Sequence, residues 1–267
     1  MDRFVESPTR KIDALKEELA SRGRDIILLS TGQPSIPPPK WAREELAKLL
    51  LEDSMKLYAY TPTDGRRSVK EAILEDLRTY GVELEPGQLA LSAGGQSALF
   101  ATVLTLFKPG DKVLVFDPMY FGYWPLLDYV DARVIAIRED LGDGFQPPVD
   151  AVAEILSRER VKALILVSPD NPTGRVIDAG RARALAELAI DHGVWLIVDE
   201  AYRTLTYDRE HVYIYNYASE NTISLNTFSK DPGIPGWRLG YVYGPREVVK
   251  RVKLVVQETV YCPPSIA

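Results

Sequence analysis

Short apolar runs alternate with helix-type patterns along the chain from residue 88 onward. The runs cover 88–92, 112–116, 133–137, 163–167, 195–199, 222–226 and 239–243. Between them, apolar positions spaced three and four residues apart predict helices over 96–107, 123–130, 149–157 and 179–192. Near-continuous apolar strands separated by helices are typical of a parallel sheet that is covered on both faces. We therefore predict an α/β fold with a mostly parallel, seven-stranded sheet.

The last two runs are joined by a long irregular segment, which leaves open an antiparallel direction for one of them. Before residue 88, the pattern predicts a helix over 12–22, a short strand over 26–29 and a second helix over 40–51, with a proline-rich loop at 34–39. Near the other end, residues 248–256 again have helical apolar spacing.

Composition restricts the function classes without selecting one. The 267 residues are 46% apolar, enough for one large domain with a full core, and the net charge of −6 gives no support for nucleic-acid binding. The lone Cys262 permits no internal disulfide, which fits a reducing compartment. The charged first ten residues do not resemble a secretory signal, and no apolar run has the length of a membrane span. We expect a cytoplasmic protein without a membrane partner.

With only His192 and His211 in the chain, a Ser-His-Asp triad or a histidine-rich metal site is improbable, and we predict no metal. Two loops that follow predicted strands contain candidate site residues instead. Ser92-Ala93-Gly94-Gly95-Gln96 turns from a strand into a helix, whose first N–H groups suit a phosphate. Ser168-Pro169-Asp170-Asn171-Pro172-Thr173-Gly174 holds Asn171 above the strand ends. Taken alone, either loop is more often an ordinary turn.

Two further segments place charged groups at strand ends. Asp199 ends an otherwise apolar strand, where it is either a helix cap or a counter-ion for a buried cation. The segment 226–240 places Lys230 after a strand and Arg238 before the next one, interleaved with the hydroxyls of Thr227 and Ser229. A buried lysine readily loses its charge and becomes a nucleophilic amine, and the hydroxyls with Arg238 form a set of anion donors. This segment is the most specific element of the sequence.

Taken together, these segments resemble the fold-type I pyridoxal-5'-phosphate (PLP) enzymes, and among them the class I/II aminotransferases of the aspartate and aromatic type. The resemblance runs from Leu29 to about Tyr261 and rests on Asn-Pro-Thr-Gly, Asp-Glu-Ala-Tyr and Ser-Lys…Gly-Trp-Arg-Leu-Gly in the family's order. It implies an N-terminal arm with part of a small domain at 1–40, a PLP-binding large domain at 41–245, and the start of an interdomain helix at 246–267.

The resemblance also implies roles for individual residues. Lys230 would hold PLP as a Schiff base and then move a proton between the substrate Cα and the cofactor. Asp199 would keep the pyridine nitrogen protonated, and Tyr202 and Asn171 would donate to the ring oxygen O3'. The remaining implied contacts are a ring-stacking Tyr120, substrate contacts of Gly32 and Asn171, and phosphate donors from Gly95, Gln96, Thr227 and Arg238, with Ser229 as an addition.

Two N-terminal segments extend the resemblance. Ser30-Thr31-Gly32-Gln33-Pro34 resembles the family segment that closes on substrate, although Gln33 stands where the family often has Glu. In the segment 58–65, Tyr60 matches the tyrosine that reaches the phosphate of the partner subunit, which implies a homodimer with shared active sites. The family's arginine clamp for the substrate carboxylate comes from beyond the segment at 256–262, and no matching arginine follows Arg251.

The sequence therefore predicts a PLP-dependent aminotransferase that moves an amino group from an amino acid to a 2-oxo acid. Two alternatives stay open at this point. A lyase or synthase of the same fold would use the same residues, because the outcome depends on which Cα bond the substrate clamps align. A non-catalytic regulator module is the weaker alternative, because about thirty residues precede the first loop and contain neither a helix-turn-helix pattern nor a basic patch.

Overall fold

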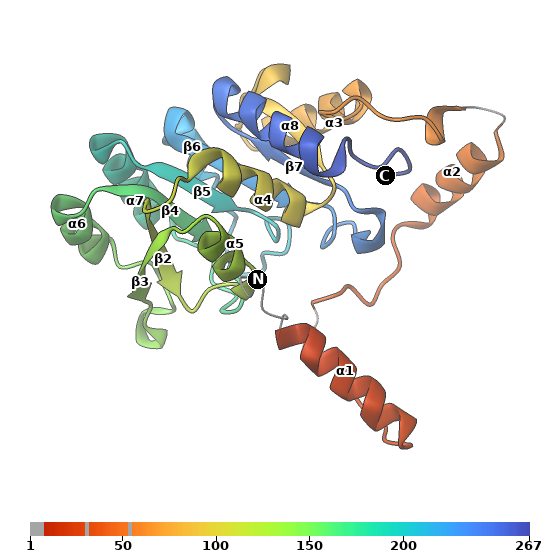
Figure 1. The fold of residues 1–267 in the computed structure, drawn as a ribbon, viewed down its shortest axis with the longest axis horizontal. Helices are drawn as coiled ribbons and strands as arrows, with labels where there is room; N and C mark the ends of the chain where they lie inside the picture. The colour runs from red at the N-terminus through yellow and green to blue at the C-terminus, as the bar shows by residue number, and fades with distance from the viewer. Residues whose placement is uncertain (1–7, 30–31, 53–54) are drawn as a thin grey trace.

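The computed structural model describes residues 8–29, 32–52 and 55–267, and its centre is a single seven-stranded sheet (Figure 1). The strand order is β1-β7-β6-β5-β4-β2-β3. The strands are β1 (Leu89–Ser92), β2 (Lys112–Asp117), β3 (Arg133–Arg138), β4 (Val161–Val167), β5 (Trp195–Asp199), β6 (Thr222–Thr227) and β7 (Gly240–Tyr243). Each predicted strand from residue 88 onward is confirmed to within two residues.

Strand direction resolves the question that the sequence left open. The neighbours β3, β2, β4, β5 and β6 run parallel to one another, whereas β7 pairs antiparallel with both β6 and β1. All strands except β7 therefore end at the same edge of the sheet. In open α/β sheets this carboxyl edge is where ligands bind.

Helices cover both faces of the sheet. One face packs against α4 (Gly95–Leu106), α5 (Trp124–Tyr129) and α8 (Arg246–Val260). The opposite face packs against α3 (Arg67–Thr79), α6 (Val149–Arg158) and α7 (Ala179–His192). Alternate residues of each strand supply the two cores: in β2, Val113 and Val115 join the first and Leu114 joins the second. This two-sided burial explains why the strands are nearly continuous in apolar residues.

The N-terminal elements lie apart from the sheet (Figure 1). They are α1 (Pro8–Ser21) and α2 (Lys40–Leu51), and α2 buries none of its residues. The predicted strand at 26–29 is wrong: these residues form no ladder, and the side chains of Ile27 and Leu29 are 83% and 92% exposed. A strand requires a hydrogen-bonded neighbour, and no strand in the described ranges pairs with this segment.

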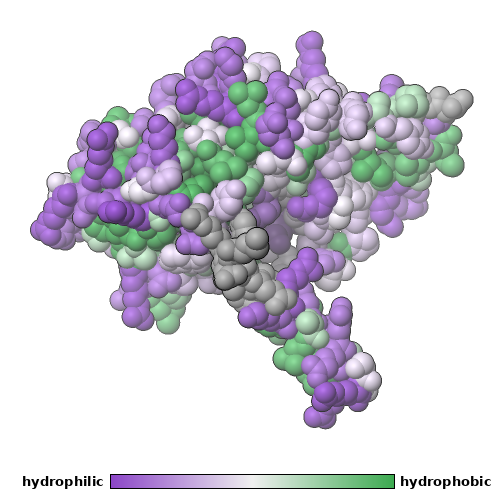
Figure 2. Space-filling model, viewed as in Figure 1, coloured by the Kyte–Doolittle hydropathy of each residue, from purple (hydrophilic) through white to green (hydrophobic). Residues whose placement is uncertain are grey.

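One helix was absent from the sequence prediction. Helix α3 packs Ile73, Leu74 and Leu77 against β1 and β7, while its other positions are mostly charged. Elsewhere the surface is mixed, with apolar side chains gathered around α2 and on one side of α1 (Figure 2). In the part of the chain that the structure describes, no helix combines the length and apolarity needed to cross a membrane.

Candidate active site

A pocket of about 450 Å³ opens at the carboxyl edge of the sheet, and most of the predicted site residues line it. The walls come from the loops after β1, β2, β4, β5 and β6 and from the segment around Gly32. The predicted residues among the lining are Gly32, Gly95, Gln96, Tyr120, Asn171, Asp199, Tyr202, Thr227, Ser229, Lys230 and Arg238. Segments from residue 32 to residue 238 thus meet in one cavity.

Asp199 lies at the end of β5, on the pocket floor. Its carboxylate accepts hydrogen bonds from the Tyr123 hydroxyl (2.7 Å) and from the Ala201 backbone N–H (3.0 Å). Burial raises the pKa of Asp199, and these two hydrogen bonds offset only part of that effect. Such a carboxylate gains most from a cation placed beside it in the pocket. The structure therefore supplies the environment of a counter-ion, whereas a helix cap would not require this depth.

The Lys230 amine reaches into the same cavity from the turn after β6. Its Nζ donates to the Gly32 carbonyl oxygen at 2.6 Å and lies 5.4 Å from the centre of the Tyr202 ring. Burial lowers the pKa of Lys230, and the nearby Asp199 carboxylate offsets part of this. A partly desolvated amine with a lowered pKa is the form that adds to carbonyl groups.

The tyrosine and asparagine of the site lie near each other. Burial raises the pKa of the Tyr202 phenol, and the nearby Asn171 side chain offsets only part of this effect, so that the hydroxyl stays protonated and able to donate. Tyr120 is held on the opposite wall, with its ring against Phe121 and edge-on to Tyr123. Burial also raises the pKa of Tyr120. These groups offer neutral donors and an aromatic face rather than charge.

A cluster of hydroxyls and N–H groups forms the end of the pocket beside the first turn of α4. The Thr227 hydroxyl donates to Ser229 Oγ at 2.9 Å, and the Ser229 N–H donates back to Thr227 Oγ1 at 3.2 Å. Gly95 and Gln96 begin α4, whose first N–H groups point out of the helix with the positive end of its dipole. This arrangement suits a phosphate group.

Arg238 completes this cluster through close backbone packing. It has φ of +58°, a left-handed conformation that costs energy for a non-glycine residue and recurs at functional sites. A side chain at Gly94 would place its Cβ 2.5 Å from Arg238 Nη2, and one at Gly240 would lie 2.6 Å from the Gly94 carbonyl carbon. Both glycines are therefore needed for the guanidinium and the first turn of α4 to approach each other.

Two residues of the site were missed at the sequence level. Tyr123, fully buried, donates to Asp199 although 76 positions separate them. Asn226 lines the pocket, and its Nδ2 is buried without a hydrogen-bond partner among the described residues. No local pattern identifies Tyr123 as a site residue, because a tyrosine at the start of a helix is usually interpreted as part of the hydrophobic core. Asn226 is the last residue of the strand predicted over 222–226, a position like that of Asp199, and this position was its signal.

Tyr60 does not join the pocket. It lies between α2 and α3 with 83% of its surface exposed, and its ring packs edge-on against Tyr261 with centroids 4.9 Å apart. The predicted role of Tyr60, which concerns a partner subunit, stays a prediction. The segment that precedes Gly32 includes Ser30 and Thr31, which lie outside the described residues.

The family model for aminotransferase class I and II matches residues 24–267. The aspartate/prephenate aminotransferase of Thermus thermophilus is 32% identical over 98% of this chain and 67% of its own length. The arginine–pyruvate transaminase of Pseudomonas aeruginosa is 34% identical over 84% of this chain and 57% of its own length.

Among solved structures, the aspartate aminotransferase of Thermus thermophilus with maleate superposes with a TM-score of 0.93 at 31% identity. The match covers 98% of this chain and 68% of that one. The chain thus spans roughly two thirds or less of the length of these relatives.

Proposed function

The chain belongs to the class I and II aminotransferases, and on that premise we propose that it moves the amino group of an amino acid to a 2-oxo acid with PLP held on Lys230. The observation that carries the proposal is the presence of Lys230 and Asp199 in one pocket, a partly desolvated amine near a buried carboxylate whose pKa is raised. When bound, PLP supplies a ring that withdraws electrons from the substrate Cα.

The described residues fit this cofactor on their own chemistry. Asp199 would face the protonated ring nitrogen, which supplies the cation that its raised pKa calls for. Tyr202 and Asn171 would donate to the ring oxygen, and Tyr120 would cover the ring face. Asn226 also lines this pocket, and its buried Nδ2 has no hydrogen-bond partner among the described residues.

The phosphate would lie in the cradle beside α4. The residues that would supply its donors all line this pocket: Gly95 and Gln96 through backbone N–H groups, Thr227 and Ser229 through hydroxyls, and Arg238 through its guanidinium. Among the described residues, the Arg238 guanidinium donates to the carbonyl oxygens of Pro235 (2.9 Å) and Ala93 (3.4 Å). These contacts orient the planar guanidinium and leave N–H donors for a bidentate contact with the phosphate.

Proton transfer at the substrate Cα would fall to Lys230. The lowered pKa of its amine makes the neutral, basic form accessible, and the hydrogen bond to the Gly32 carbonyl oxygen holds the amine in the pocket. Gly32 would also offer its backbone to the substrate, because it lies beside both Lys230 Nζ and the Tyr202 hydroxyl.

The relatives guide the choice of substrates. Their names refer to aspartate, prephenate, arginine and pyruvate, and the Thermus enzyme was solved with maleate, a dicarboxylate. We place dicarboxylic and aromatic amino acids first in a panel of donors, each assayed with 2-oxoglutarate. Formation of glutamate and the matching 2-oxo acid in equal amounts supports the transaminase. Ammonia release from the donor would instead indicate a lyase, and no reaction with any donor would favour the regulator. Lys230→Arg is the control, which should form no product.

We also propose that the working form is a homodimer, in the cytoplasm, with sites shared between subunits. The side chains of Tyr60, Trp41, Leu51 and Met55 are exposed, and apolar surface gathers around α2 (Figure 2), which supports this assembly. Mixing a Tyr60→Ala variant with a Lys230→Ala variant should restore activity, because one hybrid site then has both residues. No recovery, with heterodimers demonstrated, would mean that Tyr60 acts within its own chain or not at all.

A further inference from the structure

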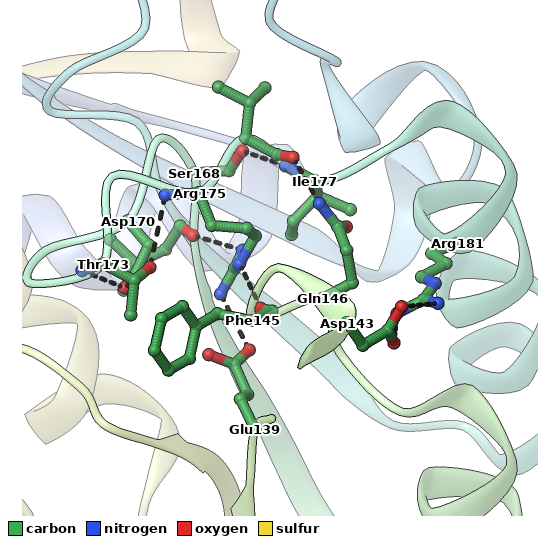
Figure 3. Close-up of polar contacts among 12 residues, drawn as sticks. Glu139, Asp143, Phe145, Gln146, Ser168, Asp170, Thr173, Arg175, Ile177 and Arg181 are labelled. Atoms are coloured by element: carbon green, nitrogen blue, oxygen red, sulfur yellow. Dashed lines mark hydrogen bonds and ion pairs between the residues drawn. The ribbon is translucent and has the colours of Figure 1, made fainter. Parts of the chain in front are cut away.

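A buried ion pair outside the pocket holds the loop that presents Asn171 (Figure 3). This loop, residues 168–174, follows β4. Its first residue is tied to the end of β5, because the Ser168 N–H donates to the Asp199 carbonyl oxygen at 3.0 Å. Within the loop, the Asp170 carboxylate accepts from the N–H (3.0 Å) and the hydroxyl (2.6 Å) of Thr173. These bonds shape the turn but do not fix it to the rest of the fold.

Arg175 makes that attachment. Its guanidinium is almost completely buried and donates to three acceptors at 2.9 Å each: the Val167 carbonyl oxygen, the Phe145 carbonyl oxygen and the Glu139 carboxylate. Val167 is the last residue of β4, directly before the loop. The planar fork of an arginine fixes the relative positions of three acceptors, which a single-point ammonium cannot do.

The Glu139 carboxylate accepts directly from this fork, and the Asp170 carboxylate acts on it at longer range. It follows β3, and its side chain is fully buried, with Oε2 lacking a hydrogen-bond partner among the described residues. The other charged groups near it are the carboxylates of Asp170 and Asp117, while Arg138 and Asp140 line the adjacent surface groove. Burial raises the pKa of Glu139 to about 7, against the opposing effect of Arg175.

Stability alone does not account for this pair. Removing two charges from water offsets most of their attraction, and apolar residues of similar size stabilise a core at least as well. What the pair does provide is a fixed geometry between β3, the end of β4 and the turn at Phe145. Resting on the function proposed above, we propose that Glu139 and Arg175 are positioning residues that set where Asn171 meets the cofactor ring oxygen and Tyr202.

A second arginine–carboxylate pair nearby serves as a matched control (Figure 3). Arg181, at the start of α7, contacts Asp143 through two bonds of 2.6 and 3.0 Å, but the two side chains are 28% and 54% exposed. In the described part of the chain, the Arg181 side chain pairs with Asp143 and Asp178, and Arg181 is not among the residues that line the pocket. Replacing either arginine by lysine keeps the charge and removes the fork, so Arg181→Lys controls for the loss of a fork, while thermal stability reports the difference in burial between the two sites.

The test compares Arg175→Lys, Glu139→Gln, Arg181→Lys and Asn171→Ala in PLP-loaded protein. The readout is the pH midpoint of the visible absorbance of the bound cofactor, measured with thermal stability. Weakening the donor to the ring oxygen should raise this midpoint by about half a pH unit to one pH unit. We expect Arg175→Lys to raise the absorbance midpoint by at least half as much as Asn171→Ala does. Glu139→Gln should do the same above pH 7. Arg181→Lys should keep the wild-type midpoint.

A purely structural role predicts a different pattern: Arg175→Lys would lower the thermal midpoint and leave the absorbance midpoint at the wild-type value. That result would overturn the proposal while leaving the proposed function intact. Should Arg175→Lys not fold, Glu139→Gln decides, because burial outweighs the attraction of Arg175 at this carboxyl and a neutral side chain is tolerated there. If wild-type protein shows no cofactor absorbance, the proposed function itself fails, and the positioning role fails with it.

Discussion

Asp199 and Glu200 are adjacent carboxylates that face opposite sides of the sheet and have opposite surroundings. Asp199 opens into the pocket, with two hydrogen-bond donors and a raised pKa. Glu200 is fully buried on the other face, where it accepts from the Tyr243 hydroxyl (2.7 Å) and from Ser224 (3.2 Å), with His211 3.7 Å away. Both carboxylates accept hydrogen bonds from their own chain, but of the two it is Asp199 that also opens into the pocket.

The contrast indicates that two adjacent residues have different roles, one in the pocket and one in the fold. A raised pKa caused by burial in a pocket marks a group whose partner arrives from outside. A buried carboxyl surrounded by hydroxyls belongs to the fold, because its donors come from β6 and β7. Substitutions at the two positions should therefore affect different measurements, catalysis for Asp199 and unfolding for Glu200.

The largest effect is expected at Asp199. Asp199→Ala should lower the rate of the amino-transfer half-reaction by about 10²- to 10³-fold, because the counter-ion of the ring nitrogen is lost. Its free energy of unfolding without cofactor should change little, because relief of the buried carboxylate offsets the loss of the acceptor for the buried Tyr123 hydroxyl. Stopped-flow kinetics and chemical denaturation measure the two quantities. A near-wild-type rate would reduce Asp199 to a cap.

Glu200→Ala should give the reverse pattern. Loss of the carboxyl group leaves the Tyr243 and Ser224 hydroxyls buried without an acceptor and opens a cavity, so the free energy of unfolding should fall by about 3 to 5 kcal/mol. The folded fraction should still bind PLP with an affinity within a few-fold of wild type. Unchanged stability with lost cofactor binding would erase the distinction between the two carboxylates.

Glu139 sharpens the comparison through pH. Its pKa of about 7 lies above the ordinary value of 4.5, so the native state holds this proton more tightly than the unfolded state does. The free energy of unfolding should therefore fall as the pH rises from about 4.5 to about 7, by up to roughly 3 kcal/mol relative to Glu139→Gln. Urea denaturation of both proteins at several pH values tests this. Parallel curves across that window would contradict it.

The smallest effect is expected at Tyr60. With most of its ring exposed, Tyr60→Phe should change the free energy of unfolding by less than about 0.5 kcal/mol. If its hydroxyl reaches the phosphate of a partner subunit, the PLP dissociation constant should still rise by about three- to tenfold. Calorimetric titration measures this constant. An unchanged constant would remove Tyr60 from the site and place it with the surface residues.

The sequence predicted the elements whose hydrophobic pattern is local. The strands from residue 88 onward are apolar on both faces, so their positions could be located without any knowledge of pairing. Lys230, Asp199 and Asn171 each follow such a strand, and parallel topology then places them at one edge. The direction of β7 could not be predicted in this way, because it depends on how the segment at 228–239 packs.

Other features depend on contacts between distant positions. Arg175 and Glu139 are 36 positions apart, and each alone resembles a solvated residue after a strand. The segment at 26–29 has the composition of a strand but no neighbour to pair with. Helix α3 was overlooked because its apolar positions, Ile73, Leu74 and Leu77, form a narrow stripe among charges. In each case the structure of the segment depends on the distant residues that contact it, and the segment's own sequence does not identify them.

The central claim is that Lys230 is the cofactor-bearing amine, and borohydride reduction tests it most directly. The protein is incubated with PLP, reduced, digested and mapped by mass spectrometry, with Lys230→Arg as the control. The account predicts a visible absorbance band that reduction abolishes, one modified peptide containing Lys230, and no such peptide in the control. A stoichiometric adduct on another lysine, or no adduct at all, would contradict it.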